Sequence, residues 1–560
     1  MQLSIMRSTG ELVFLSLSVL SVFFLSLGRC QFPRQCITND GGMFTVKEEC
    51  CPEEIPGNNA TRCGGQGKGV CVALNTNDYR QQLNRASYSA CTNNDPRIGW
   101  PYSFGVRRYC KCENKWDGPG CTECAEGYIK DSNNNCVVRT GSQMLIRKNA
   151  LNMNDEEWTT FWRVVNESKV TYSDYLVYKG SATTTTDGNP RLSGNFTFVD
   201  NVTVYNVFVW MHYYATKGNV DNQPKQCDFA HEQSGFLTWH RAWLLFVERE
   251  LRKLSSTPND FAIPYWDWTD PSSIAPLFNN SKRSRMGKSY FYDGVDNTPK
   301  VIEYTDNEAA NFESDEWQTV CVSGRNEGPN IESVCDPSTP DNDYVKRCLG
   351  CIVGALDDRE LPTVDEQEKM LKSATSFDAP PWNKEPNGVQ SFRNSLEGWV
   401  NISTIDQPGQ SKYHEFHNRV HIYMGGIMAD VSPAPNDPIF LLHHANIDRL
   451  FEVWLRKVDR GDYVPNSNQA IHPGHAKNDW IIPIVPFVTH GDIYKTAPVL
   501  GYEYDNIEFP DEPTMATKAS AATEATQGTG AAVHMAVPAL TQTFMVAAAV
   551  LVGLMCHYFA

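Results

Sequence analysis

The sequence predicts a mainly α-helical domain that follows a small module cross-linked by disulfides. Four segments show helical spacing, at residues 204–216, at 239–254, around 417–421 and around 440–454. Eleven of the 18 cysteines lie between Cys36 and Cys136, far more densely than elsewhere in the chain. A chain of 560 residues is long enough for two or three domains of ordinary size.

Residues 1–30 are typical of a secretory signal peptide. Residues 12–28 form an apolar run that follows Arg7 and ends at small and polar residues, so we expect cleavage near Cys30 or Gln31. The mature chain would then enter an oxidising compartment, where disulfides persist. Six Asn-X-Ser/Thr sequons agree with a glycosylated chain of the secretory pathway, at Asn59, Asn166, Asn195, Asn201, Asn279 and Asn401.

Residues 31–138 form the predicted disulfide module. The module is rich in turn-forming residues, and the spacing of its last five cysteines resembles an EGF-like domain: Cys110, Cys112, Cys121, Cys124 and Cys136. The odd number of cysteines leaves one thiol, for which Cys91 is the candidate. Zinc is a competing interpretation for the first four of those five cysteines, but the signal peptide favours disulfides.

Residues 139–511 follow as one predicted catalytic domain, rich in aromatic residues and helical patterns. Its longest irregular region spans residues 270–396 and contains four cysteines. We expect one disulfide between Cys321 and Cys335 and another within the Cys348-X-X-Cys351 motif. A redox role for that motif is the alternative, but no βαβ pattern surrounds it.

The C-terminal region is predicted to tether the protein to a membrane. Residues 512–542 are a low-complexity stalk of Ala, Thr and Gly that cannot form a core, and residues 543–560 are a hydrophobic end. Small residues, a polar spacer and a terminal apolar tail are typical of a GPI-attachment signal, and a short transmembrane helix is the alternative. The formal net charge of −17 argues against nucleic acid as a partner.

The histidines are unevenly distributed, since eight of the 13 lie within residues 212–240 and 414–444. His417 and His421 are four residues apart, so on a helix both imidazoles project from one face. His444 lies in the apolar stripe of the following helical pattern. A second set consists of His212, His231 and His240. A single histidine is more often an ordinary core residue than a ligand, but two sets of three indicate a pair of metal ions.

Six imidazoles without a carboxylate or thiolate partner suit copper, because imidazole favours copper and zinc whereas carboxylates favour magnesium, calcium or manganese. Three protein ligands on each metal leave coordination positions open. Two such ions a few ångströms apart can bind molecular oxygen between them, which a single closed zinc site cannot do.

The sequence resembles the tyrosinases, and more broadly the type-3 copper proteins. The resemblance depends on long gapped motifs: WMHYY at residues 210–214, the pattern from His231 through FLTWHR to Glu248, IPYWDW at residues 263–268, HNRVH at 417–421 and DPIFLLHHANID at 437–448. It begins at residues 31–36 and ends near GYEY at 501–504. It implies a central helical bundle that holds two copper ions.

Position by position, the resemblance implies that one copper is held by His212, His231 and His240, and the other by His417, His421 and His444. The competing candidates are His414 and His443. His414 is expected to be peripheral because Asn418 follows His417 as the family motif requires. His443 is assigned to the substrate pocket, together with Met428 and Val431.

The resemblance also implies an activity. With molecular oxygen, such enzymes hydroxylate monophenols such as tyrosine and oxidise o-diphenols such as dopa to o-quinones, as in melanin synthesis. The phenol, with a pKa of about 10, must first lose its proton. In the family, a water held by a glutamate and an asparagine is the base, and Glu397 and Asn418 match these positions here.

Other interpretations stay open at this stage. A tyrosinase-related protein would carry zinc and act as a tautomerase, or act as a dihydroxyindole oxidase; the absence of a Cys-X-X-Cys motif after IPYWDW leaves room for this. His443, Ala445 and Met428 match the tyrosinase version instead. A non-enzymatic oxygen-binding or interaction protein is a further alternative, and Cys227 is a weak candidate for a thioether. The oligomeric state and the destination, with the melanosome among the options, are not specified.

Overall fold

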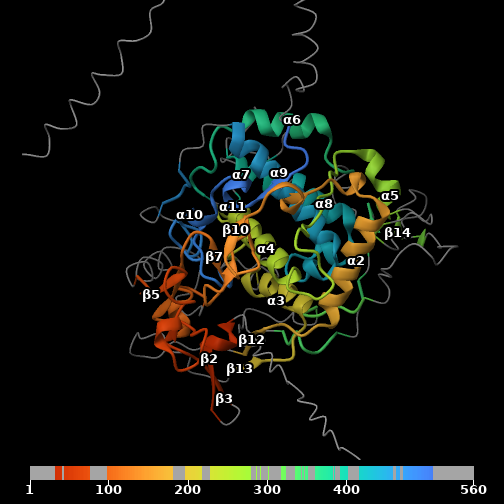
Figure 1. The fold of residues 1–560 in the computed structure, drawn as a ribbon. Helices are drawn as coiled ribbons and strands as arrows, with labels where there is room; N and C mark the ends of the chain where they lie inside the picture. The colour runs from red at the N-terminus through yellow and green to blue at the C-terminus, as the bar shows by residue number, and fades with distance from the viewer. Residues whose placement is uncertain are drawn as a thin grey trace, which may run out of the picture. The chain divides into compact units, whose positions relative to one another are not determined.

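Three helices are buried on almost every side, namely α3 (Val204–Thr216), α4 (Phe236–Leu251) and α9 (Ile439–Lys457). Helix α4 packs against both α3 and α9, and α8 (Phe416–Met424) packs against α9 (Figure 1). All 13 residues of α3 are buried, because its sequence is apolar or aromatic around the whole circumference. The prediction of a mainly α-helical domain is confirmed.

The computed structural model describes residues 32–40, 43–75, 97–180, 196–216, 228–278, 285–286, 290–291, 300–301, 317–322, 335–341, 344–345, 347–350, 360–382, 384, 391–400, 415–457, 462–466 and 471–508. All of these residues belong to one compact unit. The expected signal peptide, stalk and C-terminal anchor lie outside the described residues. Within the described part of the chain, no helix is both long and apolar enough to cross a membrane.

Further helices surround the buried ones: α2 (Asp155–Val170), α5 (Ile274–Phe278), α6 (Val364–Ser373), α7 (Phe392–Glu397), α10 (His490–Ile493) and α11 (Ala497–Leu500). Helix α7 carries Glu397 at its last position and packs against α8 and α4. Helix α4 begins at Phe236, three residues before the predicted start, because Phe236 and Leu237 are buried and continue the apolar face. It ends at Leu251, three residues before the predicted end.

The strands are short. Those before the helices are β1 (Phe32–Pro33), β2 (Ile37–Asp40), β3 (Met43–Val46), β4 (Glu49–Cys50), β5 (Gly69–Ala73), β6 (Arg108–Cys112), β7 (Trp116–Asp117), β8 (Glu123–Cys124), β9 (Tyr128–Lys130), β10 (Cys136–Val138) and β11 (Leu145–Arg147). The others are β12 (Tyr175–Gly180), β13 (Phe196–Val199), β14 (Tyr290–Phe291), β15 (Lys300–Val301), β16 (Cys348–Leu349) and β17 (Tyr502–Tyr504). Strand β11 pairs in parallel with β17, with Leu145 opposite Tyr502, and so joins the two ends of the helical region.

Five disulfides join described residues of the cysteine-rich segment: Cys36–Cys50, Cys51–Cys71, Cys63–Cys110, Cys112–Cys121 and Cys124–Cys136. The four cysteines considered for zinc are all in these bridges, so the zinc interpretation is wrong. The expected Cys321–Cys335 disulfide is present. Cys91, Cys227 and Cys351 lie outside the described residues.

The cysteine-rich segment also contacts the ends of two buried helices. Arg97 donates to the backbone carbonyl of Tyr214 near the C-terminal end of α3, at 2.8 Å. Lys253, just after α4, pairs with Glu123 at 3.0 Å, and Arg252 pairs with Glu126. Carbonyl groups at a helix C-terminus lack partners within the helix, so these cations stabilise both ends.

Candidate metal centre

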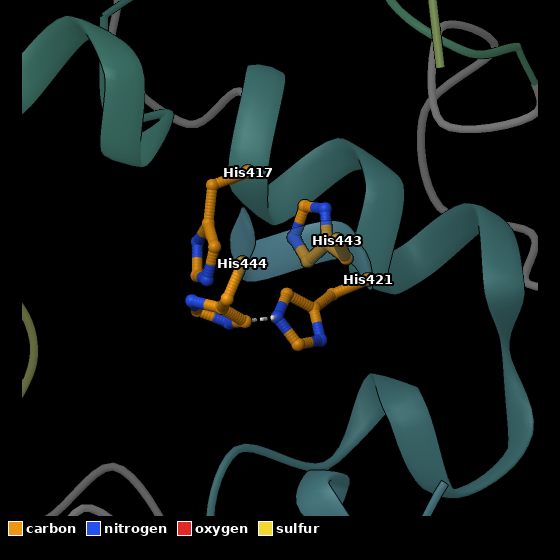
Figure 2. A group of neighbouring side chains, drawn as sticks. All are labelled: His417, His421, His443 and His444. Carbon is orange, nitrogen blue, oxygen red and sulfur yellow. Dashed lines mark hydrogen bonds between the residues drawn. The ribbon is translucent and has the colours of Figure 1, made fainter. Parts of the chain in front are cut away.

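The structure brings the predicted histidines together in two groups. The first group consists of His212 on α3, His231 in the segment before α4, and His240 on α4. The second group consists of His417 and His421 on α8 with His443 and His444 on α9, and Figure 2 shows how these four side chains converge. In each group one nitrogen from every ring lies within 4.8 Å of the others. All these rings are buried except that of His421, which is partly buried.

Backbone carbonyls fix the tautomer of three of these rings. His212 Nδ1 lies 3.2 Å from the carbonyl oxygen of Ser432. His240 Nδ1 lies 2.9 Å from the carbonyl oxygen of Phe236, and His421 Nδ1 lies 2.7 Å from that of Met428. A carbonyl oxygen only accepts hydrogen bonds, so each Nδ1 carries the proton. The lone pair is therefore on Nε2, which leaves that nitrogen able to bind a metal.

Glycine makes the Met428 contact possible. Gly425 ends α8 with φ 62° and ψ −164°, a conformation that is essentially restricted to glycine. The chain therefore turns sharply after α8, and the carbonyl of Met428 returns to His421 from seven residues further along. The local sequence thus sets the orientation of His421.

Side chains orient two further rings. Asp228 Oδ2 lies 3.2 Å from His231 Nδ1, and Asp228 Oδ1 accepts the backbone N–H groups of Ala230 and His231 at 2.7 and 2.8 Å. Burial opposes the charge on Asp228, but His231 and these hydrogen bonds outweigh it and lower the pKa of Asp228. Burial likewise opposes the charge on His231, yet Asp228 raises the pKa of His231. His417 Nδ1 lies 2.9 Å from Asn418 Oδ1.

The Nε2 atoms of His212, His240 and His417 are buried and have no hydrogen-bond partner among the described residues. A buried polar atom without a partner costs about 1–3 kcal/mol. The Nε2 atoms of His421 and His444 face each other at 3.4 Å, as the dashed line in Figure 2 shows. Unsatisfied lone pairs that converge in this way fit metal ions.

The two groups face each other. The rings of His240 and His444 stack with centroids 4.2 Å apart, and those of His231 and His417 lie 6.1 Å apart. Burial, reinforced by nearby imidazoles, holds the pKa values of His240, His417 and His444 well below the ordinary value. These rings are therefore neutral at physiological pH, and the neutral form is the one that binds a metal.

Comparison with known proteins agrees with this geometry. Residues 202–457 match the family model described as the common central domain of tyrosinase. The tyrosinase of Pelophylax lessonae is 33% identical over 521 residues, with 89% of this chain and 85% of that protein covered. This chain belongs to the tyrosinase family. It is therefore a type-3 copper oxidoreductase, and its two histidine groups are consistent with a two-copper site.

Relatives within the tyrosinase family include both tyrosinases and 5,6-dihydroxyindole-2-carboxylic acid oxidases. The tyrosinase of Gallus gallus is 31% identical, with 86% of this chain and 83% of that protein covered. The 5,6-dihydroxyindole-2-carboxylic acid oxidase of Homo sapiens is 29% identical, with 88% and 86% covered. Among solved structures, a variant polyphenol oxidase from Thermothelomyces thermophila is 18% identical, with 66% of this chain and 90% of that chain covered and a TM-score of 0.42.

Glu397 and Asn418 are the two residues predicted to hold the water that acts as the base. They lie on the neighbouring helices α7 and α8. Glu397 Oε2 accepts from Arg393 Nη1 at 3.0 Å, and Glu397 Oε1 accepts the backbone N–H of Glu232. Burial raises the pKa of Glu397, and Arg393 opposes this shift. A Cβ atom at Gly398 would lie 3.1 Å from Asn418 Cβ, so the helix end that carries Glu397 is next to Asn418.

The three residues predicted for the substrate pocket have different environments. His443 is fully buried, and its ring stacks on that of His417 with centroids 5.2 Å apart. Met428 is also fully buried, whereas 45% of Val431 is exposed. His443 thus groups with the three histidines of the second set. His414, the other competing candidate, lies outside the described residues.

Sequence reasoning missed the residues that orient the rings. Asp228 lies only three residues before His231, and an acidic residue at that spacing could have been proposed as its partner. The carbonyls of Ser432 and Met428 leave no signal, since every residue has a carbonyl. His475 and His490 are buried and contact the segment around His231, but they lie far from it in the sequence.

Proposed function

We propose that this protein hydroxylates monophenols such as tyrosine and oxidises o-diphenols such as dopa to o-quinones. The main support is the pair of facing histidine groups, whose buried Nε2 lone pairs converge. His212, His231 and His240 would hold one copper ion, and His417, His421 and His444 the other. When bound, the copper pair would supply the binding and reduction of molecular oxygen.

The side chains of the protein would remove the proton of the phenol. A phenol has a pKa of about 10, so a base must assist its ionisation near neutral pH. Glu397, with a pKa raised by burial, would take up that proton through a water that Asn418 helps to hold. Arg393 and the backbone N–H of Glu232 hold the carboxylate beside His231 and limit its movement.

Substrate would enter past Val431, the exposed member of the predicted pocket. His443 and Met428, being fully buried, would form the inner wall rather than the entrance. A planar aromatic ring suits such a wall, because aromatic faces pack on imidazole rings with centroids about 4.5–7 Å apart.

Metal content distinguishes this proposal from the related alternative. A zinc-bearing tautomerase or a dihydroxyindole oxidase is the second candidate, favoured by the 29% identity to the human dihydroxyindole carboxylic acid oxidase. The purified protein should contain about two copper ions per chain and convert both tyrosine and dopa. Two zinc ions, with no turnover of tyrosine, would support the second candidate instead.

Two substitutions test the residue roles. His417→Ala should remove a copper ligand and abolish oxidation of dopa as well as tyrosine. Glu397→Gln should lower the rate on tyrosine much more than the rate on dopa, because a diphenol ionises more readily. Glu452→Gln is the matched control. Like Glu397, Glu452 is a buried carboxylate paired with arginine, but it lies among the charges between α4 and α9 and not at the predicted base. An unchanged tyrosine-to-dopa ratio in Glu397→Gln would contradict the role of Glu397.

We also propose a tethered location in the secretory pathway. The five disulfides of the cysteine-rich segment support passage through an oxidising compartment. The hydrophobic end at residues 543–560 would provide the tether. Release of the protein from cells by a phosphatidylinositol-specific phospholipase would identify a GPI anchor, whereas resistance combined with membrane association would identify a transmembrane segment.

A further inference from the structure

Two buried imidazoles lie next to the first histidine group but outside the region that matches the family model. His475 and His490 are both fully buried, and they follow the end of the matched region at residue 457. Both contact the segment that contains His231 or the start of α4. Neither ring belongs to the two groups that would hold metal.

His475 joins the two ends of the segment 228–235. Its Nε2 lies 2.7 Å from the carbonyl oxygen of Asp228, and its Nδ1 accepts the backbone N–H of Gly235 at 3.3 Å. The proton is on Nε2, because a carbonyl oxygen only accepts. Burial, reinforced by His490, lowers the pKa of His475 to about 3, so the ring stays neutral and keeps its acceptor nitrogen.

His231 lies inside that bridged segment. Asp228 uses its carbonyl for His475 and its carboxylate for the backbone N–H and the Nδ1 of His231. A displacement of the Asp228 backbone would therefore move the carboxylate that orients His231. His475 thus reaches His231 through a single intermediate residue.

The fit at Gly235 is tight. A Cβ atom there would lie 2.6 Å from His475 Nδ1 and 2.7 Å from His490 Cε1. Both rings pack against Gly235, the residue before α4, but only His475 also accepts its backbone N–H and reaches back to Asp228. Close packing of this kind allows the segment one position and resists displacement.

His490 provides a natural comparison. Its Nδ1 lies 2.6 Å from Thr238 Oγ1 and its Nε2 lies 2.7 Å from the carbonyl oxygen of Gly474. It has the same burial and the same chemistry as His475, and the two ring centroids are 6.3 Å apart. However, its hydrogen bonds reach α4 and its own segment, not the turn from Asp228 to His231.

We infer that His475 is a positioning residue for the first metal site: it fixes the Asp228 turn so that His231 presents Nε2 to the ion held with His212 and His240. This inference rests on the proposed function, because it assumes a metal ion at that group. His475 makes no contact with the metal itself. Loss of a hydrogen bond made directly to a ligating histidine typically weakens metal binding about 10–100-fold, and because His475 acts through Asp228 we expect the lower end of that range, about 10-fold.

The test is titration of the metal-free full chain with Cu²⁺ in competition with a chelator. His475→Asn and His475→Gln form a matched pair, because the longer amide of glutamine can reach the Asp228 carbonyl from the position of Nε2, whereas that of asparagine cannot. His475→Asn should bind one of its two copper ions about 10-fold more weakly. His475→Gln should recover most of that loss, and His490→Asn should bind both ions with nearly wild-type affinity.

A spectroscopic measurement shows whether only one ion of the pair is lost. At a copper level that fills both sites of the wild type, His475→Asn should show the paramagnetic signal of an isolated Cu²⁺ ion. Equal copper affinity in all three variants and the wild type would overturn the inference, as would equal losses in His475→Asn and His490→Asn. Failure of the wild-type chain to bind two copper ions would instead contradict the proposed function.

Discussion

Arg147 lies at the centre of a buried group of charges that joins α4 to α9, and its replacement offers a direct test of how the metal centre is supported. Arg147 donates from Nε and Nη2 to the two carboxylate oxygens of Glu248 on α4, both at 2.9 Å. It also donates from Nη1 to Asp448 Oδ2 on α9 at 2.8 Å. The Arg147 side chain is fully buried, and those of Glu248 and Asp448 are at most 2% exposed.

Arg147→Met keeps a long apolar side chain but leaves Glu248 without its cation. Asp448 is less affected, because it still has Arg241 as an ion-pair partner. Removing one partner from a buried ion pair costs about 3–5 kcal/mol, since the remaining charge stays desolvated. The unfolding entropy is about 2.1 cal/mol/K per residue, so the roughly 480 residues between the signal peptide and the stalk give about 1 kcal/mol/K. Dividing the loss of about 3–5 kcal/mol by this entropy gives a fall in Tm of about 3–5 °C.

The assay is thermal unfolding of the metal-free protein at a single scan rate, because a bound metal would add its own stabilisation. Arg456→Ala is the control, since Arg456 pairs with Glu452 and Glu503 at 2.7 Å but is 23% exposed. A partly exposed pair is worth about 0–1 kcal/mol, so the control should shift Tm by about 1 °C or less. A Tm for Arg147→Met no lower than that of the control would refute the reasoning.

Three further predictions concern single residues. Asp228→Asn should weaken binding of one copper ion about 10–100-fold in a Cu²⁺ titration, because an amide N–H₂ group would face the Nδ1–H of His231. Gly398→Ala should lower Tm, because φ is +108° and the new Cβ would lie 2.0 Å from the carbonyl oxygen of Glu415. Burial lowers the pKa of Lys169 to about 7, so the unfolded chain binds more protons above that pH and stability should rise between about pH 7 and 10. Lys169→Met should remove that rise in a plot of Tm against pH.

The sequence was sufficient to predict the helices that carry His212, His240 and His444 and the two sets of three histidines, but it did not place His443 with the second set. Long apolar and aromatic runs with helical spacing in α3 and α9 indicate helices that are buried over most of their surface. The four-residue spacing of His417 and His421 likewise specifies that both project from one face of α8. Such features depend on neighbours within one or two helical turns, which periodicity detects.

The partners of the buried polar groups could not be predicted, because they lie far apart in the chain. Arg147 is 101 residues from Glu248 and 301 from Asp448, and His475 is 247 residues from Asp228. An arginine has the same sequence context whether it is buried among carboxylates or exposed to water. The pairing is decided by tertiary packing, and no local pattern records it.

Helix α4 shows why these distant pairs matter for the metal centre. Its first half carries His240, and the next residue, Arg241, binds Asp448 on α9, the helix that carries His444. Two turns further along, Glu248 binds Arg147. An interface of Leu and Val alone would tolerate small shifts between the helices, whereas each buried charge here loses its partner if α4 slides along α9. The ion pairs therefore hold α4 and α9 in one register, and in that register the rings of His240 and His444 stack at 4.2 Å, one from each half of the site.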